Sequence, residues 1–160
     1  MPEWSNFFVA TVSASAALLG LIFLGISINL KQILSARGID LRASITMILL
    51  MGVLLISILL LVPTASAIIR GLYVLVTGFI VWLTITLLDG KIYRSKPAVY
   101  RRLHRYNIAF TQVATLPYLV SGILLITGNG AGMYWLVAAI IFSIIRAVLD
   151  AWVLLVEINR

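Results

Sequence analysis

The sequence contains no cysteine, and only 11% of its 160 residues are charged. A soluble domain carries roughly 25% charged residues, so too few are present here to cover a surface that faces water. The lack of cysteine excludes disulfide bonds, thiolate nucleophiles and metal sites with cysteine ligands. The remaining composition, which is 62% hydrophobic, is typical of an integral membrane protein. It excludes a cytosolic enzyme, a secreted disulfide scaffold and a disordered tail.

The apolar residues form five long runs, each near the roughly 20 helical residues that cross a bilayer core. Because a backbone in lipid must satisfy its own hydrogen bonds, each run is expected to be an α-helix. The spans are predicted at about residues 4–30, 43–62, 71–88, 108–127 and 133–156, with a basic cytoplasmic loop at 89–107. Pro63 and Arg70 lie between the second and third runs and indicate a short turn there. We therefore expect residues 1–160 to form one all-α transmembrane domain, a bundle of five helices.

The distribution of positive charge predicts the orientation of this bundle. Arg70 would lie on one side, and Arg146 lies within the fifth span. The other side would carry Lys31, Arg37, Arg42, Lys91, Arg94, Lys96, Arg101, Arg102, Arg105 and Arg160. Basic loops stay in the cytoplasm, so we expect the N-terminus outside and the C-terminus inside. This orientation bias, together with the attraction of basic residues to anionic lipid headgroups, accounts for the net charge of +7. No nucleic-acid partner is therefore expected.

The first span carries an unusual stripe of polar and small residues. Asn6, Ser13, Gly20 and Ser27 recur every seven residues and stay on one face of a helix. One interpretation is close packing against another span or another copy, because small residues let helix backbones approach. The other is a pore formed by several copies, in which the oxygens of the stripe replace part of an ion's hydration shell. In that pore, Glu3 and Asn6 would flank the outer mouth.

The fifth span contains Arg146 and Asp150, four residues apart and nearer to the cytoplasmic side. An arginine at the centre of a helix costs about 2.5 to 3.5 kcal/mol on insertion scales, so a partner is expected. Asp150 is within reach at this spacing, and Asp89 is another possible partner. The pair is interpreted either as a buried structural ion pair or as a cytoplasmic gate in which Asp150 is shared among subunits.

The side chains that enzymes use are scarce in this sequence. His104 is the only histidine, which excludes a histidine-rich metal site or a haem held by two histidines of one chain. Ser121 has no accompanying base, which serine proteolysis requires. Asp89 and Asp150 could come together as two catalytic acids, but no accompanying sequence motif supports that function. We expect no enzymatic activity, no catalytic residue, no cofactor and no metal.

The first span contains the strings Phe7-Phe8-Val9-Ala10, Ser13-Ala14-Ser15-Ala16-Ala17-Leu18-Leu19-Gly20-Leu21-Ile22-Phe23 and Ser27-Ile28-Asn29-Leu30, and Leu61-Val62-Pro63 follows later. Over this first third of the chain, the sequence resembles a group of small uncharacterised bacterial multi-span inner-membrane proteins. The resemblance implies a protein of the bacterial inner membrane. It carries no activity and no catalytic residue.

These observations lead to two functional hypotheses. The first is a homo-oligomeric ring that acts as a pore or transporter for small ions, with cations expected. The first span would line the pore, and Arg146 and Asp150 would regulate its cytoplasmic end. The second is a non-conducting adaptor or modulator that packs its first span against a larger membrane protein. The expected partners are the lipid bilayer, further copies of the chain and, in the first hypothesis, small ions.

Overall fold

The computed structural model describes residues 2–35, 39–63, 66–95 and 101–158 of the chain. Within these ranges the regular structure is entirely helical. The helices are α1 (Pro2–Ile28), α2 (Leu30–Ser35), α3 (Ile39–Leu61), α4 (Ala67–Ser95), α5 (Arg101–Ile126) and α6 (Ala131–Ile158). All except α2 are long and apolar enough to cross a membrane, which gives five candidate spans. The prediction of an all-α, multi-pass membrane protein with five spans is confirmed.

Several helices extend further than hydropathy predicted. The third span, predicted at 71–88, is part of a helix that runs from Ala67 to Ser95, and α5 begins at Arg101 instead of 108. Most of the segment 89–107, predicted as a basic loop, is therefore helical. Hydropathy marks only the part of a helix that lies in hydrocarbon, whereas the backbone hydrogen bonds continue into the headgroup region.

The first span ends slightly earlier than predicted, at Ile28 instead of residue 30. The side-chain amide of Asn29 donates a hydrogen bond to the carbonyl oxygen of Gly25, at 3.0 Å. Such local bonds compete with regular helix geometry. The chain turns at Asn29 and continues into the short helix α2.

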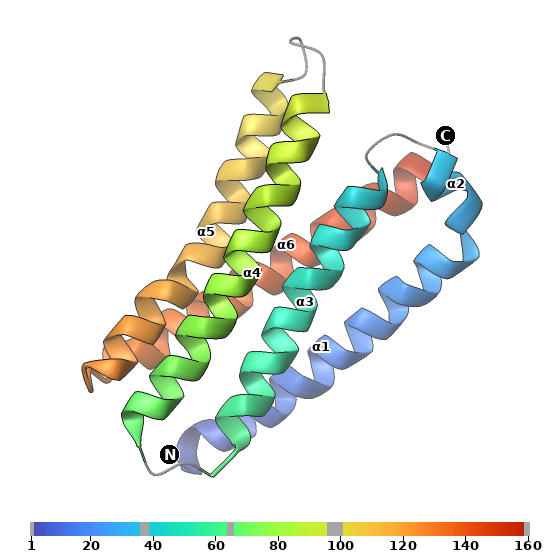
Figure 1. The fold of residues 1–160 in the computed structure, drawn as a ribbon. Coiled ribbons are helices and arrows are strands. Elements are labelled where there is room, and N and C mark those ends of the chain that lie inside the picture. The colour runs from blue at the N-terminus through green and yellow to red at the C-terminus, as the bar shows by residue number, and fades with distance from the viewer. Residues whose placement is uncertain (1, 36–38, 64–65, 96–100, 159–160) are drawn as a thin grey trace.

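The helices pack as an antiparallel bundle in which α1 is the outermost member (Figure 1). α1 packs mainly against α3, and α3 in turn contacts α4 and α6. α5 fills the other side of the bundle, between α4 and α6. As a result, one whole side of α1 is not covered by the protein.

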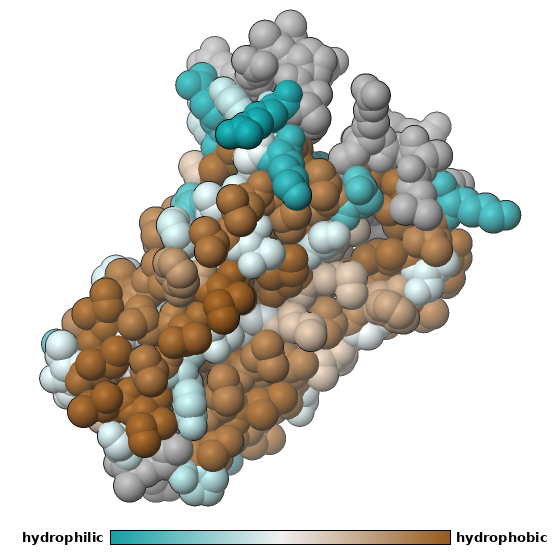
Figure 2. Space-filling view, viewed as in Figure 1, coloured by the Kyte–Doolittle hydropathy of each residue, from teal (hydrophilic) through white to brown (hydrophobic). Residues whose placement is uncertain are grey.

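Buried apolar side chains fill the interior along its length. One cluster joins α1, α3, α4, α5 and α6 and includes Val53, Val74, Tyr118 and Leu136. A second cluster joins α3 and α4 and includes Leu49 and Ile85. The outer surface is also largely apolar (Figure 2). Apolar residues on both sides of the helices are expected where lipid replaces water as the solvent.

The two ends of the bundle differ in charge. One end, named the basic end here, carries Lys31, Arg42, Lys91, Arg94 and Arg105, and hydrophilic side chains gather there in Figure 2. The opposite end, named the N-terminal end, carries the start of α1, the connection from α3 to α4 and the turn from α5 to α6. Among the described Lys and Arg residues, Arg70 is the one at the N-terminal end.

A tight turn joins α5 to α6 at the N-terminal end. Gly128 has a φ angle of 74°, which is a conformation that residues with a Cβ rarely adopt. The Asn129 side chain then accepts a hydrogen bond from the backbone N–H of Ala131, at 3.0 Å. This bond satisfies one of the backbone donors at the start of α6.

Glycines allow α4 and α5 to approach closely. A Cβ added at Gly122 would lie 2.8 Å from both the Cα and the N atom of Leu75, and one added at Gly71 would lie 2.6 Å from the N atom of Ile126. Gln112 also bridges the two helices, because it accepts a hydrogen bond from Trp82 at 2.7 Å and donates one to Thr86 at 3.1 Å. α4 and α5 therefore form a tightly joined pair.

Candidate functional site

The candidate site is an ion pair inside the fifth span. The guanidinium of Arg146 lies 3.0 Å from a carboxylate oxygen of Asp150. The exposed fractions of the two residues are only 8% and 5%. Both point inward because they share a face of α6 with the buried residues Ser143 and Ala147, at helical spacing. An ion pair at this depth is held away from both water and lipid.

Two further charged residues surround this pair. Arg42 on α3 and Asp89 on α4 each interact electrostatically with both Arg146 and Asp150. Asp89 is 4% exposed, so it is also enclosed by the bundle. We name Arg42, Asp89, Arg146 and Asp150 the charge cluster. Its two cations balance its two anions, which is the condition under which buried charges are tolerated.

The ring of Phe110, on α5, completes the surroundings of Arg146. The guanidinium carbon lies 5.6 Å from the centroid of this ring, within the range of a cation–π contact. The Nε atom of Arg146 is buried and makes no hydrogen bond to the part of the chain that the structure describes. A buried donor of this kind can bond to a water molecule or an ion.

The charge cluster lies near the basic end of the bundle. Arg146 is 15 residues after the start of α6, which is about 22 Å along the helix axis. Arg42 is in the first turn of α3, and Asp89 is in the last third of α4. All four charges therefore lie in the half of the bundle nearer to the basic end, toward the edge of a hydrocarbon core about 30 Å thick.

Buried hydroxyl groups link α5 to α6 beside the charge cluster. Tyr118 donates a hydrogen bond to Ser143 at 3.1 Å, and Ser143 donates one to the carbonyl oxygen of Ala114 at 3.3 Å. Further toward the N-terminal end, Ser121 donates a hydrogen bond to the carbonyl oxygen of Gly132, at 2.8 Å. These bonds fix the register of the two helices and thus the position of Arg146 and Asp150.

The stripe of the first span lies on the outside of the bundle. Asn6, Ser13, Gly20 and Ser27 are all exposed. α1 turns Phe8, Thr11 and Ser15 toward the bundle, and the stripe is roughly 160° away from these buried residues around the helix axis. The Ser13 hydroxyl donates a hydrogen bond to the carbonyl oxygen of Val9 at 3.0 Å.

The structure does not bring the two predicted sets of site residues together. Arg146 and Asp150 are enclosed by the bundle, whereas the stripe of α1 faces away from it. Glu3, predicted at an outer mouth, is in the first turn of α1, and its side chain lies outside the described part of the chain. The connection between the two sets is α3, which carries Arg42 and packs against α1.

Arg42 is a member of the site that sequence reasoning missed, because it was counted only as one of the basic loop residues. α3 begins at Ile39, so Arg42 is already helical. Thr46, Leu49 and Val53 are buried, and Arg42 precedes them at the spacing of the same helix face. This periodicity was visible in the sequence and predicts an inward position for Arg42 once the start of the helix is known.

Among the residues that the structure describes, no three His, Cys, Asp or Glu side chains are grouped so that they could hold a metal ion. Comparison of the chain with family models, with curated proteins and with solved structures finds no match.

Proposed function

We propose that the protein is a homo-oligomeric pore or transporter for small ions in the bacterial inner membrane, with its basic end in the cytoplasm. The observation that carries this proposal is the exposure of the whole stripe Asn6, Ser13, Gly20 and Ser27 on the outer side of α1. The Asn6 amide and the Ser27 hydroxyl would lose favourable interactions with water on a surface that faces lipid, which favours a protein or water neighbour for this face.

Self-association through α1 provides such a neighbour. Small side chains let two helix backbones approach closely, and membrane helices associate mainly through that kind of packing. The interior of one copy is filled by its own apolar side chains, such as Val53, Val74 and Leu136. A conduit for ions would accordingly form between copies, with the α1 stripes facing its axis.

The charge cluster would act on this conduit through α3. Arg42 joins α3 to the cluster, and α3 also packs against α1. A change in the charge balance at Arg146 and Asp150 would shift the basic end of α3 and so the end of α1 that carries Ser27. We propose that the cluster regulates the cytoplasmic end of the pore in this way. The inferred cation preference rests on the oxygens of the stripe and on the acidic residues.

Ser27→Leu is expected to leave the oligomer intact and to lower ion flux by about tenfold, because a leucine makes this part of the proposed pore lining apolar and expels water from it. Flux is measured as ion release from liposomes that contain the purified protein. The mass of the complex extracted with its native lipids gives the subunit number. The control is Leu21→Phe, which enlarges an exposed residue of α1 about 90° away from the stripe.

The pore would be supported if the wild-type protein forms a ring and carries flux, and if Ser27→Leu lowers that flux while Leu21→Phe does not. A wild-type protein that extracts as a monomer and carries no flux would contradict it. The adaptor hypothesis would then be preferred, and one observation already favours it in part. The Ser13 hydroxyl is bonded to its own helix, as in a packing surface, and Ser13→Leu should then break the complex with a partner.

Asp150→Asn is expected to leave membrane insertion intact and to change flux, because the amide can still accept a hydrogen bond from Arg146 but no longer balances its charge. Insertion is checked by the amount of protein extracted from membranes, and flux by the same liposome measurement. The matched control is Asp40→Asn, since Asp40 is an exposed acid on α3 outside the charge cluster. Unchanged flux in Asp150→Asn would contradict a regulatory role of the cluster.

A further inference from the structure

The ion pair between Arg146 and Asp150 is not of the strongest kind. The contact runs from Nη2 of the guanidinium to one carboxylate oxygen, Oδ1, at 3.0 Å. Nε of the same guanidinium donates no hydrogen bond to the part of the chain that the structure describes. The arrangement in which Nε and Nη2 donate two parallel bonds to one carboxylate is therefore not formed. Asp150 is held by one end of its partner only.

Burial of Asp150 penalises the charged form of its side chain. The residue is 5% exposed, and a carboxylate away from water depends on neighbouring charges and hydrogen bonds to replace the water. A neutral carboxyl group escapes this penalty. It can still accept the hydrogen bond from Nη2 of Arg146, and it gains a proton that it can donate. Protonation of Asp150 is therefore compatible with its contact to Arg146.

The charges that surround Asp150 come from three helices. Two opposite charges, Arg146 on the same helix and Arg42 on α3, interact with it, and so does one like charge, Asp89 on α4. α5 contributes the uncharged ring of Phe110, which lies over Arg146. With two cations and two anions the charge cluster is neutral, so one bound proton gives it a net charge of plus one.

Asp150 is closer to the basic end of the bundle than to the N-terminal end. It is eight residues before the end of α6 at Ile158, which is about 12 Å along the helix axis. From the start of the helix at Ala131 the distance is about 28 Å. A proton from water at the basic end therefore has the shorter path to the carboxylate.

We propose that Asp150 is the proton acceptor of a pH switch that responds to the basic side of the membrane. When that side is acidified, a proton binds to the Asp150 carboxylate, and it returns to water when the pH rises. In the protonated state, Asp89 is the remaining described anion that opposes the repulsion between Arg146 and Arg42. The contact of α6 with the start of α3 is then weakened. The effect on flux rests on the pore proposed above, and the assignment of this side to the cytoplasm rests on the proposed orientation.

The first measurement does not depend on ion flux. Infrared difference spectra of the full-length protein in liposomes are recorded as the pH is lowered from about 8 to about 5. Wild-type protein is expected to gain the carbonyl band of a protonated carboxyl group, and Asp150→Asn should lack this band. Asp40→Asn removes an exposed acid of α3 and should retain it. Identical spectra of wild type and Asp150→Asn would overturn the proposal.

Two other titratable residues require their own variants. His104 on α5 and Glu157 on α6 also lie toward the basic end, and their side chains are outside the described part of the chain. His104→Gln and Glu157→Gln are each expected to retain the band assigned to Asp150. Loss of that band in either variant would overturn the assignment of the proton to Asp150.

The second measurement follows cation flux in the same liposomes. One added positive charge near the cytoplasmic end of the pore repels cations, so acidification is expected to lower the flux of wild-type protein severalfold. Asp150→Asn should show the flux of the acidified wild type at every pH in this range, because an amide binds no proton there. Flux through Asp150→Asn that still falls on acidification would contradict the switch.

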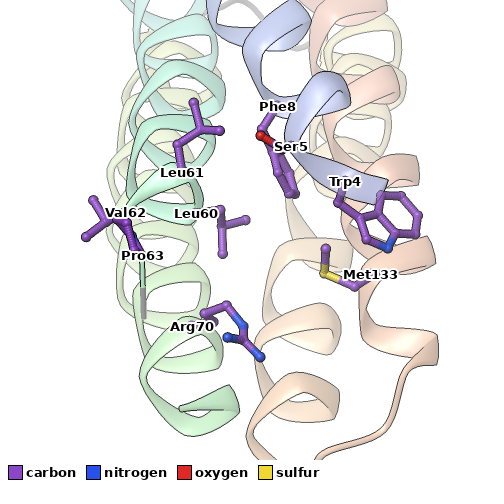
Figure 3. A pocket seen from close by; sticks show the side chains of 9 residues that line it. All are labelled: Trp4, Ser5, Phe8, Leu60, Leu61, Val62, Pro63, Arg70 and Met133. Atoms are coloured by element: carbon purple, nitrogen blue, oxygen red, sulfur yellow. The ribbon is translucent and has the colours of Figure 1, made fainter. Parts of the chain in front are cut away.

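A cavity at the opposite end of α3 provides a control for general changes in packing. It encloses about 220 Å³ between α1, α3, α4 and α6, and Trp4, Leu60 and Arg70 are among its lining residues (Figure 3). Leu60 is about 27 Å from Arg42 along α3. Leu60→Phe enlarges a side chain beside an existing space and should leave both pH responses unchanged. Equal loss of the responses in Leu60→Phe and Asp150→Asn would overturn a switch located at Asp150.

Failure of the switch and failure of the proposed pore give different results. Wild-type protein that shows the Asp150 band but carries no flux would contradict the pore and support the proton site. Protein that carries flux but lacks the band would contradict the switch and leave the pore in place.

Discussion

Asp150→Ala is expected to lower the free energy of unfolding by about 3 kcal/mol, because it leaves the buried guanidinium of Arg146 without its carboxylate. The two groups are 3.0 Å apart, and both residues are less than one-tenth exposed. The contact between the two groups offsets part of the cost of removing their charges from water, so removal of one charge leaves the other buried without that offset. Asp89 also interacts electrostatically with Arg146, so it compensates part of that cost.

The measurement is reversible unfolding in mixed micelles, followed by tryptophan fluorescence. Two comparisons show whether the effect comes from the unpaired charge. Asp40→Ala removes an exposed acid of α3 and should change stability by less than about 1 kcal/mol. The double variant Arg146→Met/Asp150→Leu removes both charges and should recover most of the loss. An Asp150→Ala protein as stable as wild type, or a double variant no better than the single one, would contradict a buried and mutually compensated pair.

Gly122→Ala is expected to destabilise the bundle by about 2 kcal/mol, because the added methyl group collides with the backbone of the neighbouring helix. Its Cβ would lie 2.8 Å from the Cα and N atoms of Leu75. A side chain could rotate away from such a contact, whereas a backbone in a helix cannot move alone. α4 and α5 would have to separate along their shared surface, and the bonds from Gln112 to Trp82 and Thr86 would lengthen.

The matched control is Gly25→Ala on α1, where an added Cβ meets no atom within 4 Å. Alanine favours helix over glycine, so this variant should be neutral or slightly more stable. The same unfolding measurement applies to both proteins. If Gly25→Ala were as destabilising as Gly122→Ala, the cost would come from the loss of glycine itself and not from the approach of α4 to α5.

Hydropathy predicted the number of spans because the bilayer imposes one simple requirement. A segment that crosses hydrocarbon must be apolar over about 20 residues and must satisfy its own backbone hydrogen bonds. The same requirement ends at the headgroups. Hydropathy therefore could not predict that α4 continues to Ser95 or that α5 begins at Arg101.

The site was predictable in one part only. Arg146 and Asp150 are neighbours on one helix, and a spacing of four residues is sufficient to predict their contact. Arg42 comes from another helix, and its approach to the pair depends on how α3 packs against α6. No local pattern in the sequence fixes that packing. The cavity beneath Trp4 depends in the same way on residues from four helices.

The sequence by itself determined that this protein crosses a membrane with five helices and that a stripe of polar and small residues follows one face of the first. It also determined that an arginine and an aspartate share a face of the last helix. Only the tertiary structure decided which faces are covered. It turned the α1 stripe outward, enclosed Arg146 and Asp150 together with Asp89, and placed Arg70 in a cavity. The reason is that a helix face in a membrane can meet lipid, a neighbouring helix or another copy. Local sequence specifies the face but not its neighbour.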